Sequence, residues 1–369
     1  MNTSLPDYIV RAGERNAHPF HMWDGIQSIP ETLSKTLEAY RDNPYAPFGK
    51  VIAGKKYVYF TGCGTSYYNG IAARYVFREI AGMNSSAEYA LEFLNYPPLY
   101  SENDACVGIS HTGGTAAVIE ALRRFKSIGG YTLGITDVAD SPLTKTVDGC
   151  LAGASGREPA LPKTRSYTAA LLKLFLLAAD VADAKKLDTR GFREGILKTP
   201  ELSAKTLAGN EQLVKSVAAN NYNKMYIFGS GINLATIHEG ALKLSEAAQI
   251  VAISLQLEEG MHGPWVTMNK GDLVVVLNFG ESNRTKCEKL MESLGHIGVD
   301  ILNITDDDSS HGHEKYRINI PAPEAFTAFY SVLPLYQLTY FTALNNCKNP
   351  DFMRLWEENY LKTRLSLPR

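Results

Sequence analysis

The sequence predicts an α/β protein built from two similar parallel-sheet units in tandem. Apolar, strand-like runs alternate with helical patterns along most of the 369 residues, which is typical of parallel strands joined by crossover helices. The pattern restarts after a polar stretch near the middle of the chain. Gly62 recurs as Gly229, 167 positions later, and Pro97 recurs as Pro264 at the same spacing. We therefore expect an internal repeat of one α/β sandwich.

The first half of the chain opens with a proline-rich arm and then alternates strands with helices. Within the arm, residues 29–40 read as one short helix. Strands are predicted at residues 57–60, 87–91, 105–109 and 131–137 and near residue 150, with helices at 67–81, up to about 128, and at 168–184.

The second half repeats this order. Strands are predicted at residues 225–228, 251–255, 273–277 and 300–304, with helices up to about 248 and at 285–296 and 325–345. The predicted boundaries are an N-terminal helical arm (1–48), a first α/β domain (49–190), a helical connector containing Pro200 (191–220), a second α/β domain (221–349) and a polar C-terminal tail (350–369).

Composition narrows the class of function. The net charge of −2 gives no electrostatic case for a nucleic-acid partner. No apolar run is long enough to span a bilayer, and the N-terminus lacks the pattern of a signal peptide. Five scattered cysteines without a CxxC pair favour reduced thiols, so we expect a cytoplasmic protein without a membrane partner. The spacing of the histidines and cysteines matches no common metal-binding pattern, and we expect no cofactor.

A glycine- and hydroxyl-rich turn follows the predicted central strand of the first copy. The segment 106–115 reads CVGISHTGGT and leads directly into a helical pattern. Free N–H groups at a helix N-terminus, together with Ser and Thr hydroxyls, form a site for an anion such as phosphate. The alternative is an ordinary strand-to-helix turn with capping residues, and the spacing alone leaves both interpretations open.

The second copy differs at the equivalent positions. Its central strand is followed by Asn278 and Glu281, and an acidic side chain in such a turn is a poor host for phosphate. Its helix instead carries Glu239, Lys243 and Glu246, spaced to share one face. They form either a solvated salt bridge or a carboxylate–lysine pair for proton transfer.

Two further segments carry candidate residues. His262 lies in a segment broken by glycine and proline, EEGMHGPW at 258–265, which suits either a structural or a catalytic histidine. The loop 158–168 reads EPALPKTRSYT and precedes the long apolar helix. Its Thr164 either caps that helix or, with Lys163, faces a ligand.

Together these segments resemble the sugar isomerase (SIS) family in its double-domain form, including the isomerase half of glucosamine-6-phosphate synthase. The resemblance runs from about residue 56 to the C-terminus, and it is carried by the motifs GCGTSYYNG (62–70), ISHTGGT (109–115), ExxxxxTRSYT (158–168), EGALKLSE (239–246) and EGMHGP (259–264). It implies two tandem SIS domains, each a three-layer αβα sandwich with a parallel sheet, acting on a sugar phosphate.

The resemblance also implies roles for individual residues. Glu246 would move a proton between C1 and C2, and His262 would open the sugar ring, reaching in from the other subunit of a homodimer. Lys243 and Glu239 would support the proton chemistry, and Lys362 in the tail would be a Schiff-base candidate. The sugar-phosphate and phosphate contacts would come from the first copy, at Thr65, Ser66, Ser110, His111, Thr112, Thr115, Lys163 and Thr164.

Departures from the family pattern leave several functions open. The chain shows no glutaminase domain and no cysteine at position 2, so we expect no glutaminase activity. His111 and Lys163 replace residues that are a Ser or Gln and a small hydroxyl in the family. The leading hypothesis is an aldose–ketose isomerase that releases ammonia, as a glucosamine-6-phosphate deaminase does. The alternatives are a deglycase for phosphorylated sugar–amino-acid adducts and a sugar-phosphate sensor without turnover.

Overall fold

The computed structural model describes residues 13–153, 155–309 and 312–367. It divides into two compact units, each with its own sheet. The first unit comprises Ser28–Glu158 and Lys163–Glu201. The second unit comprises residues 13–27, Pro159–Pro162 and Leu202–Leu367. Residues 1–12 of the predicted N-terminal arm lie outside the described residues.

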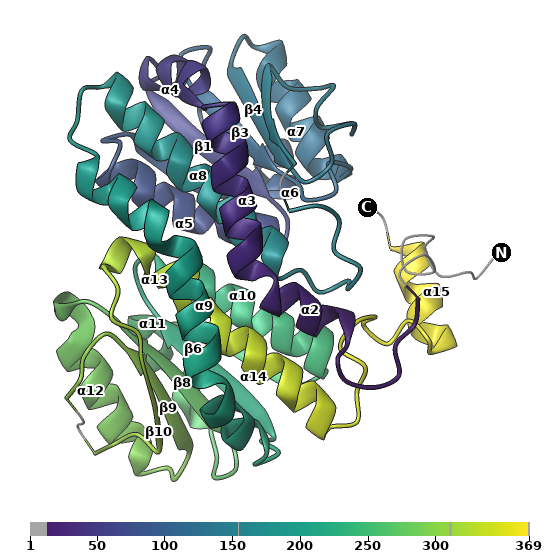
Figure 1. Cartoon of the computed structure of the whole chain (residues 1–369), viewed down its shortest axis with the longest axis vertical. Coiled ribbons are helices and arrows are strands. Elements are labelled where there is room, and N and C mark those ends of the chain that lie inside the picture. Colours follow the sequence, from purple (N-terminus) through teal and green to yellow (C-terminus); the bar gives the residue numbers. More distant parts are fainter. Residues whose placement is uncertain (1–12, 154, 310–311, 368–369) are drawn as a thin grey trace. The chain divides into compact units, whose positions relative to one another are not determined.

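The first unit is a five-stranded parallel sheet between two helical layers, as predicted (Figure 1). Its strands run in the order β2-β1-β3-β4-β5 and are β1 (Tyr57–Gly62), β2 (Asn84–Tyr89), β3 (Ala105–Ile109), β4 (Tyr131–Thr136) and β5 (Gly149–Ala152). Its helices are α3 (Ile29–Asp42), α4 (Ala46–Ala53), α5 (Thr65–Glu79), α6 (Ala90–Asn95), α7 (Ala116–Ser127) and α8 (Arg165–Ala184). Helices α5 and α8 cover one face, and α6 and α7 cover the other.

The second unit repeats this order. Its strands run β7-β6-β8-β9-β10 and are β6 (Lys224–Gly229), β7 (Val251–Gln256), β8 (Leu273–Asn278), β9 (Asp300–Thr305) and β10 (Tyr316–Asn319). Its helices are α2 (His21–Gln27), α10 (Asn233–Lys243), the π-helix η1 (Leu244–Ala248), α11 (Leu257–Met261), the 3₁₀ turns η2 (Pro264–Thr267) and η3 (Glu324–Phe326), α12 (Glu281–Gly295), α13 (Thr327–Tyr330), α14 (Val332–Asn345) and α15 (Glu358–Ser366). Strands β6 and β7 start 167 positions after β1 and β2, which confirms the repeat.

Apolar residues of the central strands build the cores of both sheets. In the first unit, Tyr59 and Cys106 pack with Phe125 of α7. In the second, Phe228 and Val276 pack with residues of α12. Burying such side chains removes apolar surface from water, which contributes roughly 25 cal/mol for each Å². The five cysteines, which all lie within the described residues, are free thiols.

The connector is one helix, α9 (Arg190–Ala218), which continues through Pro200. Other elements differ from the prediction. The expected helix at 325–345 is interrupted before Val332, so that Pro334 lies in the first turn of α14, where its missing N–H costs no helical hydrogen bond. Strand β10 was missed because its sequence, YRIN, is short and half polar. The polar tail contains α15, whose Leu361 is buried.

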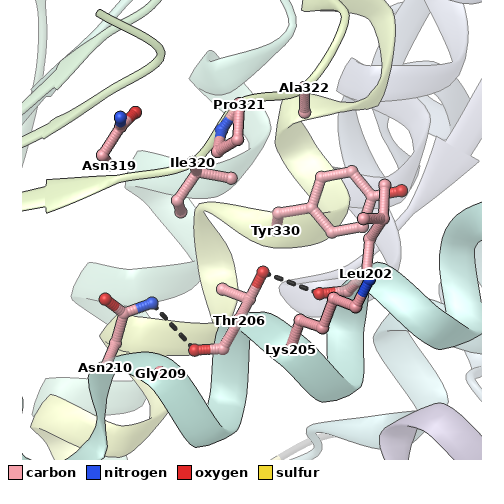
Figure 2. Close-up of a pocket in the computed structure, with 10 residues that line it drawn as sticks. All are labelled: Leu202, Lys205, Thr206, Gly209, Asn210, Asn319, Ile320, Pro321, Ala322 and Tyr330. Carbon is pink, nitrogen blue, oxygen red and sulfur yellow. Dashed lines mark hydrogen bonds between the residues drawn. The ribbon is translucent and has the colours of Figure 1, made fainter. Parts of the chain in front are cut away.

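A cavity of about 270 Å³ lies in the second unit between α9 and the segment after β10 (Figure 2). Thr206 and Asn210 face it from α9, and each hydrogen bonds to a carbonyl one turn earlier in its own helix. Tyr330 closes another side. The described residues that line this cavity include none of the predicted site residues. Within the described part of the chain, every helix is too short or too polar to cross a membrane.

Candidate active site

The predicted anion-binding turn of the first unit lies where the strand order of its sheet reverses. The chain crosses from β1 to β2 on one side of β1 and then from β2 to β3 on the other side, so β1 and β3 are neighbours at the switch point. Ligands of open parallel sheets bind outside the carboxyl ends of strands at this place. Thr65 and Ser66 follow β1 in the first turn of α5, and Ser110 to Thr115 follow β3 just before α7.

The backbone of both turns is tightly packed. A Cβ at Gly62 would lie 2.7 Å from the backbone of Ser66, so no larger residue fits there. Gly113 has a φ of +65°, and a Cβ there would collide with Ser141. The hydroxyls of Ser110 and Thr115 share a hydrogen bond of 2.9 Å. These turns therefore hold two helix N-termini and their hydroxyl groups in a fixed arrangement.

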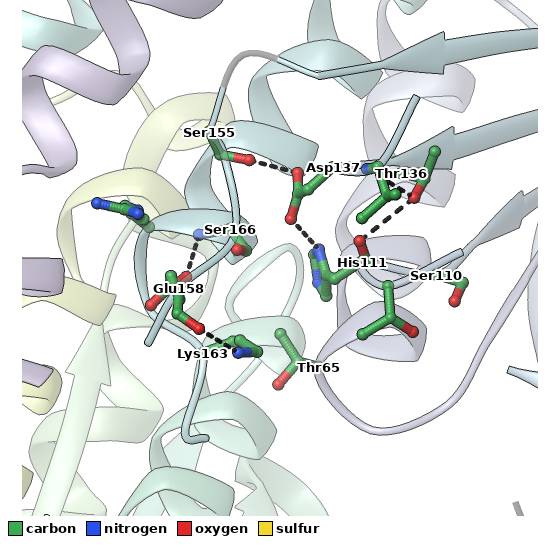
Figure 3. Close-up of polar contacts among 12 residues, drawn as sticks. Thr65, Ser110, His111, Thr136, Asp137, Ser155, Glu158, Lys163 and Ser166 are labelled. Carbon is green, nitrogen blue, oxygen red and sulfur yellow. Dashed lines mark hydrogen bonds and ion pairs between the residues drawn. The ribbon is translucent and has the colours of Figure 1, made fainter. Parts of the chain in front are cut away.

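His111 is held in place by contacts with residues at the end of strand β4 (Figure 3). The backbone N–H of Asp137 donates to the carbonyl oxygen of His111 at 3.0 Å, and the hydroxyl of Thr136 donates to the same oxygen at 3.2 Å. The carboxylate Oδ2 of Asp137 lies 3.4 Å from Nδ1 of the imidazole. The side chain of His111 is only 9% exposed. Asp137 thus fixes both the backbone and the ring of His111.

The loop before α8 is organised by the buried carboxylate of Glu158. This carboxylate accepts hydrogen bonds from the backbone N–H groups of Thr164 and Ser166 and from the hydroxyl of Thr164. A carboxylate at a helix N-terminus satisfies N–H groups that lack partners within the helix and interacts favourably with the helix dipole. Thr164 is fully buried, and its hydroxyl is directed to Glu158. Lys163 donates to the Glu158 carbonyl at 3.2 Å.

The predicted proton-transfer residues of the second unit do come together. Nζ of Lys243 lies 2.5 Å from Oε2 of Glu246 and 3.7 Å from Oε1 of Glu239. Lys243 and Glu239 are buried, and the hydroxyl of Tyr336 donates to Glu239 at 3.0 Å. Glu246 keeps 19% of its side chain exposed. One carboxylate of this cluster therefore reaches solvent beside a desolvated ammonium group.

Glu246 lies in an irregular turn that the first unit lacks. Helix α10 ends at Lys243 and continues as the π-helix η1, which closes at Gln249 with a left-handed φ of 58°. The equivalent helix of the first unit, α5, runs as a regular α-helix to Glu79, the residue that corresponds to Glu246 in the repeat. Single π turns are often found at functional sites. The extra turn changes the direction of Glu246 relative to a regular helix.

His262 and Lys362 form local ion pairs of their own. His262 follows α11, its side chain is 71% exposed, and its Nε2 lies 3.5 Å from Glu258, four residues earlier. Lys362 is also exposed and pairs with Glu358, one turn earlier in α15. Each side chain thus pairs with a neighbour in the sequence. Their assigned roles stay predictions.

The charged residues next to His111 were not predicted from the sequence. Asp137 accepts a hydrogen bond from Ser155, and Nζ of Lys173 lies 3.9 Å from the same carboxylate. Lys173 is the one charged residue in the apolar stretch Ala169–Ala179 of α8, and an isolated lysine in such a stretch is a usable signal. Across residues 13–153, 155–309 and 312–367, no group of three or more His, Cys, Asp or Glu side chains is arranged to hold a metal.

Comparison with known families identifies the repeated unit. The model of the SIS domain matches residues 51–179 and again residues 220–345. The chain belongs to the SIS domain family. Each match covers one of the two sheets, so the internal repeat is a pair of SIS domains.

Relatives by sequence are larger enzymes. The chain is 30% identical over 287 residues to the isomerizing glutamine–fructose-6-phosphate aminotransferase of Clostridium acetobutylicum, which covers 76% of this chain and 47% of that protein. It is 28% identical over 351 residues to the enzyme of the same name from Pyrococcus horikoshii, covering 93% and 58%. This SIS protein spans about half the length of the curated relatives it matches.

Solved structures share the fold. The C-terminal domain of glucosamine-fructose-6-phosphate aminotransferase from Francisella tularensis superposes with a TM-score of 0.84 at 21% identity, covering 92% of this chain and all of that one. Glucosamine-6-phosphate deaminase from Thermotoga maritima superposes with a TM-score of 0.74 at 24% identity, covering 90% and 96%. At these identities the likeness establishes the double-SIS architecture.

Proposed function

We propose that this protein is a phosphosugar aldose–ketose isomerase that releases ammonia from an amino-sugar 6-phosphate, with glucosamine 6-phosphate as the model substrate. The observation that carries the proposal is the 2.5 Å contact between Lys243 and Glu246 in the second unit. Moving a proton between two carbons requires a carboxylate that is held in place and partly shielded from water. Glu246 meets both conditions, and the first unit has no equivalent pair at its matching positions, Val76 and Glu79.

Substrate binding is assigned to the switch point of the first unit. The phosphate group would accept hydrogen bonds from the N-terminal turns of α5 and α7 and from the hydroxyls around them. Both helices are longer than three turns, so their dipoles favour an anion at that end. On this proposal, Ser110 and its neighbours anchor the substrate and take no part in bond making.

The reaction needs one proton shift and one hydrolysis. In the open-chain aldehyde, Glu246 removes the proton on C2 while the aldehyde oxygen gains a proton from water, which gives an enolamine. Glu246 then returns its proton to C1 while the nitrogen loses one proton to water, which gives a C2 imine and a C1 alcohol. Water then adds to the imine carbon and ammonia leaves, giving fructose 6-phosphate. Lys243 holds the carboxylate of Glu246 in place for the transfer, and its ammonium group also lies 3.7 Å from Glu239.

The test is to incubate the protein with glucosamine 6-phosphate and measure ammonia and fructose 6-phosphate in equal amounts. Glu246→Gln should lower the turnover roughly 10²- to 10⁴-fold, because a general base is removed, while binding of the sugar phosphate is retained. Glu292→Gln, on the exposed side of α12, is the matched control and should leave turnover unchanged. Binding without turnover would favour the sensor, and turnover that is equal in the Glu246→Gln variant would exclude the assigned base.

A further inference from the structure

His111 lies at the proposed phosphate site, and its protonation state follows from its neighbours if that site is correct. The imidazole has two nitrogens, and the structure gives them different surroundings. Nδ1 faces the carboxylate of Asp137 at 3.4 Å. Nε2 is buried and has no hydrogen-bond partner among the described residues. A buried polar atom without a partner points to a ligand that is absent from the free protein.

Asp137 is held in its charged form. Burial raises the pKa of this carboxyl, whereas the hydrogen bond from His111, the charge of Lys173 and the hydroxyl of Ser155 lower it, and the net shift is downward. Lys173 donates to the carbonyl oxygens of Thr136 and Gly153, and its Nζ lies 3.9 Å from Oδ1 of Asp137. A charged carboxylate accepts a hydrogen bond and donates none. Nδ1 of His111 therefore carries the proton that faces it.

This fixed tautomer decides what Nε2 can do. With the proton on Nδ1, a neutral ring presents a lone pair at Nε2, which repels a phosphate oxygen. A second proton turns Nε2 into a charged donor, and charge-assisted hydrogen bonds to phosphate are about twice as strong as neutral ones. In the view of Figure 3, the ring lies between Asp137 on one side and Thr65 and Lys163 on the other.

We propose that a phosphate ester binds at this site together with a proton, which His111 takes up at Nε2. His111 is then the pH-dependent part of the phosphate cradle, and Asp137 is a positioning residue that acts through it. The serine and threonine residues of the two turns, at 65–66 and 110–115, donate through hydroxyl and backbone N–H groups, whose charge is constant near neutral pH.

Other titratable groups near the ring have their own partners. Glu158 receives the N–H groups of its own loop, and Lys163 donates to the carbonyl of Glu158. Lys173 faces Asp137 and Cys150, and burial is the main cause of its lowered pKa. Arg165 donates to Ser28 and to the Arg157 carbonyl. His111 is therefore the group among them that phosphate can charge without breaking an existing hydrogen bond.

The experiment uses glucitol 6-phosphate, a reduced ester that has no carbonyl group to isomerise. Its binding to the full chain is measured by calorimetry at pH 8 in two buffers with different heats of ionisation, which counts the protons taken up. We expect close to one proton for each ester bound, and an affinity that falls up to about tenfold for each pH unit above neutral.

Three variants test whether His111 is the group that takes up the proton when the ester binds. His111→Gln should abolish proton uptake and flatten the pH dependence, since an amide does not titrate. Asp137→Asn should reduce proton uptake, because the tautomer is no longer imposed, whereas a purely structural role would lower affinity equally at every pH. His296→Gln, an exposed histidine on the second unit, is the matched control and should leave proton uptake unchanged.

The outcomes separate this inference from the proposed function. If the wild-type protein fails to bind the ester at any pH, the phosphate site itself is wrong. If it binds without taking up a proton, the phosphate site stands and the role of His111 is overturned. Proton uptake that persists in His111→Gln also overturns it. The wild-type measurement decides the main point even if a variant fails to fold.

Discussion

Each unit contains a pair of buried, oppositely charged residues that positions a candidate site residue. Lys173 and Asp137 in the first unit, and Lys243 and Glu239 in the second, are almost completely excluded from water. Burying one such charge is unfavourable unless an opposite charge and hydrogen bonds accompany it, and removing one partner typically costs about 3–5 kcal/mol. In the first unit the paired charges hold His111. In the second they hold Glu246.

A hydroxyl substitution tests the binding role of the first unit. Ser110→Ala removes the hydroxyl that bonds to Thr115 and, on our proposal, to the phosphate. We expect the KM for the sugar phosphate to rise roughly three- to tenfold with little change in kcat, because one hydrogen bond common to the ground and transition states is lost. Steady-state kinetics measure this split. Ser127→Ala, at the other end of α7, is the control, and a kcat that falls instead would contradict the anchoring role.

Among the helices, the connector α9 has a side-chain donor that replaces the backbone N–H that Pro200 lacks. Pro200 has no N–H to donate to the carbonyl of Ile196, four residues earlier. The hydroxyl of the buried residue Thr199 donates to that carbonyl instead, at 2.8 Å. The helix therefore continues through the proline without leaving this buried acceptor unsatisfied. A proline after a threonine is thus compatible with a long helix when the threonine is turned inward.

A double-mutant cycle tests this arrangement. Thr199→Val should lower the free energy of unfolding by about 1–3 kcal/mol, because the Ile196 carbonyl loses its donor. In a Pro200→Ala background the same change should cost clearly less, because the alanine introduced there supplies the missing N–H. Urea unfolding measures both differences. Equal losses in the two backgrounds would show that the hydroxyl does not replace the proline's missing donor.

In the whole molecule, the position of His262 is consistent with an active site that two copies of the chain form together. The predicted ring-opening histidine is exposed on the second unit, whereas Lys243 and Glu239 are buried. An exposed catalytic residue is expected if its side chain completes the site of a second copy. The predicted homodimer would satisfy this requirement, because a two-fold interface supplies the same residue in both directions.

Mixing two inactive variants tests the shared site. Glu246→Gln and His262→Asn should each lack activity alone. Refolding or coexpressing them together should restore about a quarter of the wild-type activity, since half of the random dimers carry one site with both groups intact. Ammonia release measures the recovery. If the mixture stays as inactive as the two single variants, His262 acts within its own chain or takes no part in the reaction. A protein that is monomeric in solution would also contradict the shared site.

Much of the fold could be predicted because its signals are local. Buried parallel strands are short apolar runs, and their glycine turns recur at a fixed spacing, so the two sheets and most helix positions follow from the sequence. Features that depend on contacts between distant segments could not be predicted. Strand β10 forms only because β9 offers an edge for its YRIN segment, and Leu361 is buried only because Leu161, Phe352 and Leu355 pack against it.

The order of residues is enough to predict a double α/β repeat in which the first copy carries hydroxyl-rich turns and the second carries Glu239, Lys243 and Glu246. How these groups are held depends on the packing of the folded chain. It turned the hydroxyl of Thr164 to Glu158, and it placed Asp137 and Lys173 behind His111. The reason is physical: the pattern of apolar residues specifies each element, but the partner of a buried charge is chosen by the packing of elements that are distant in the chain.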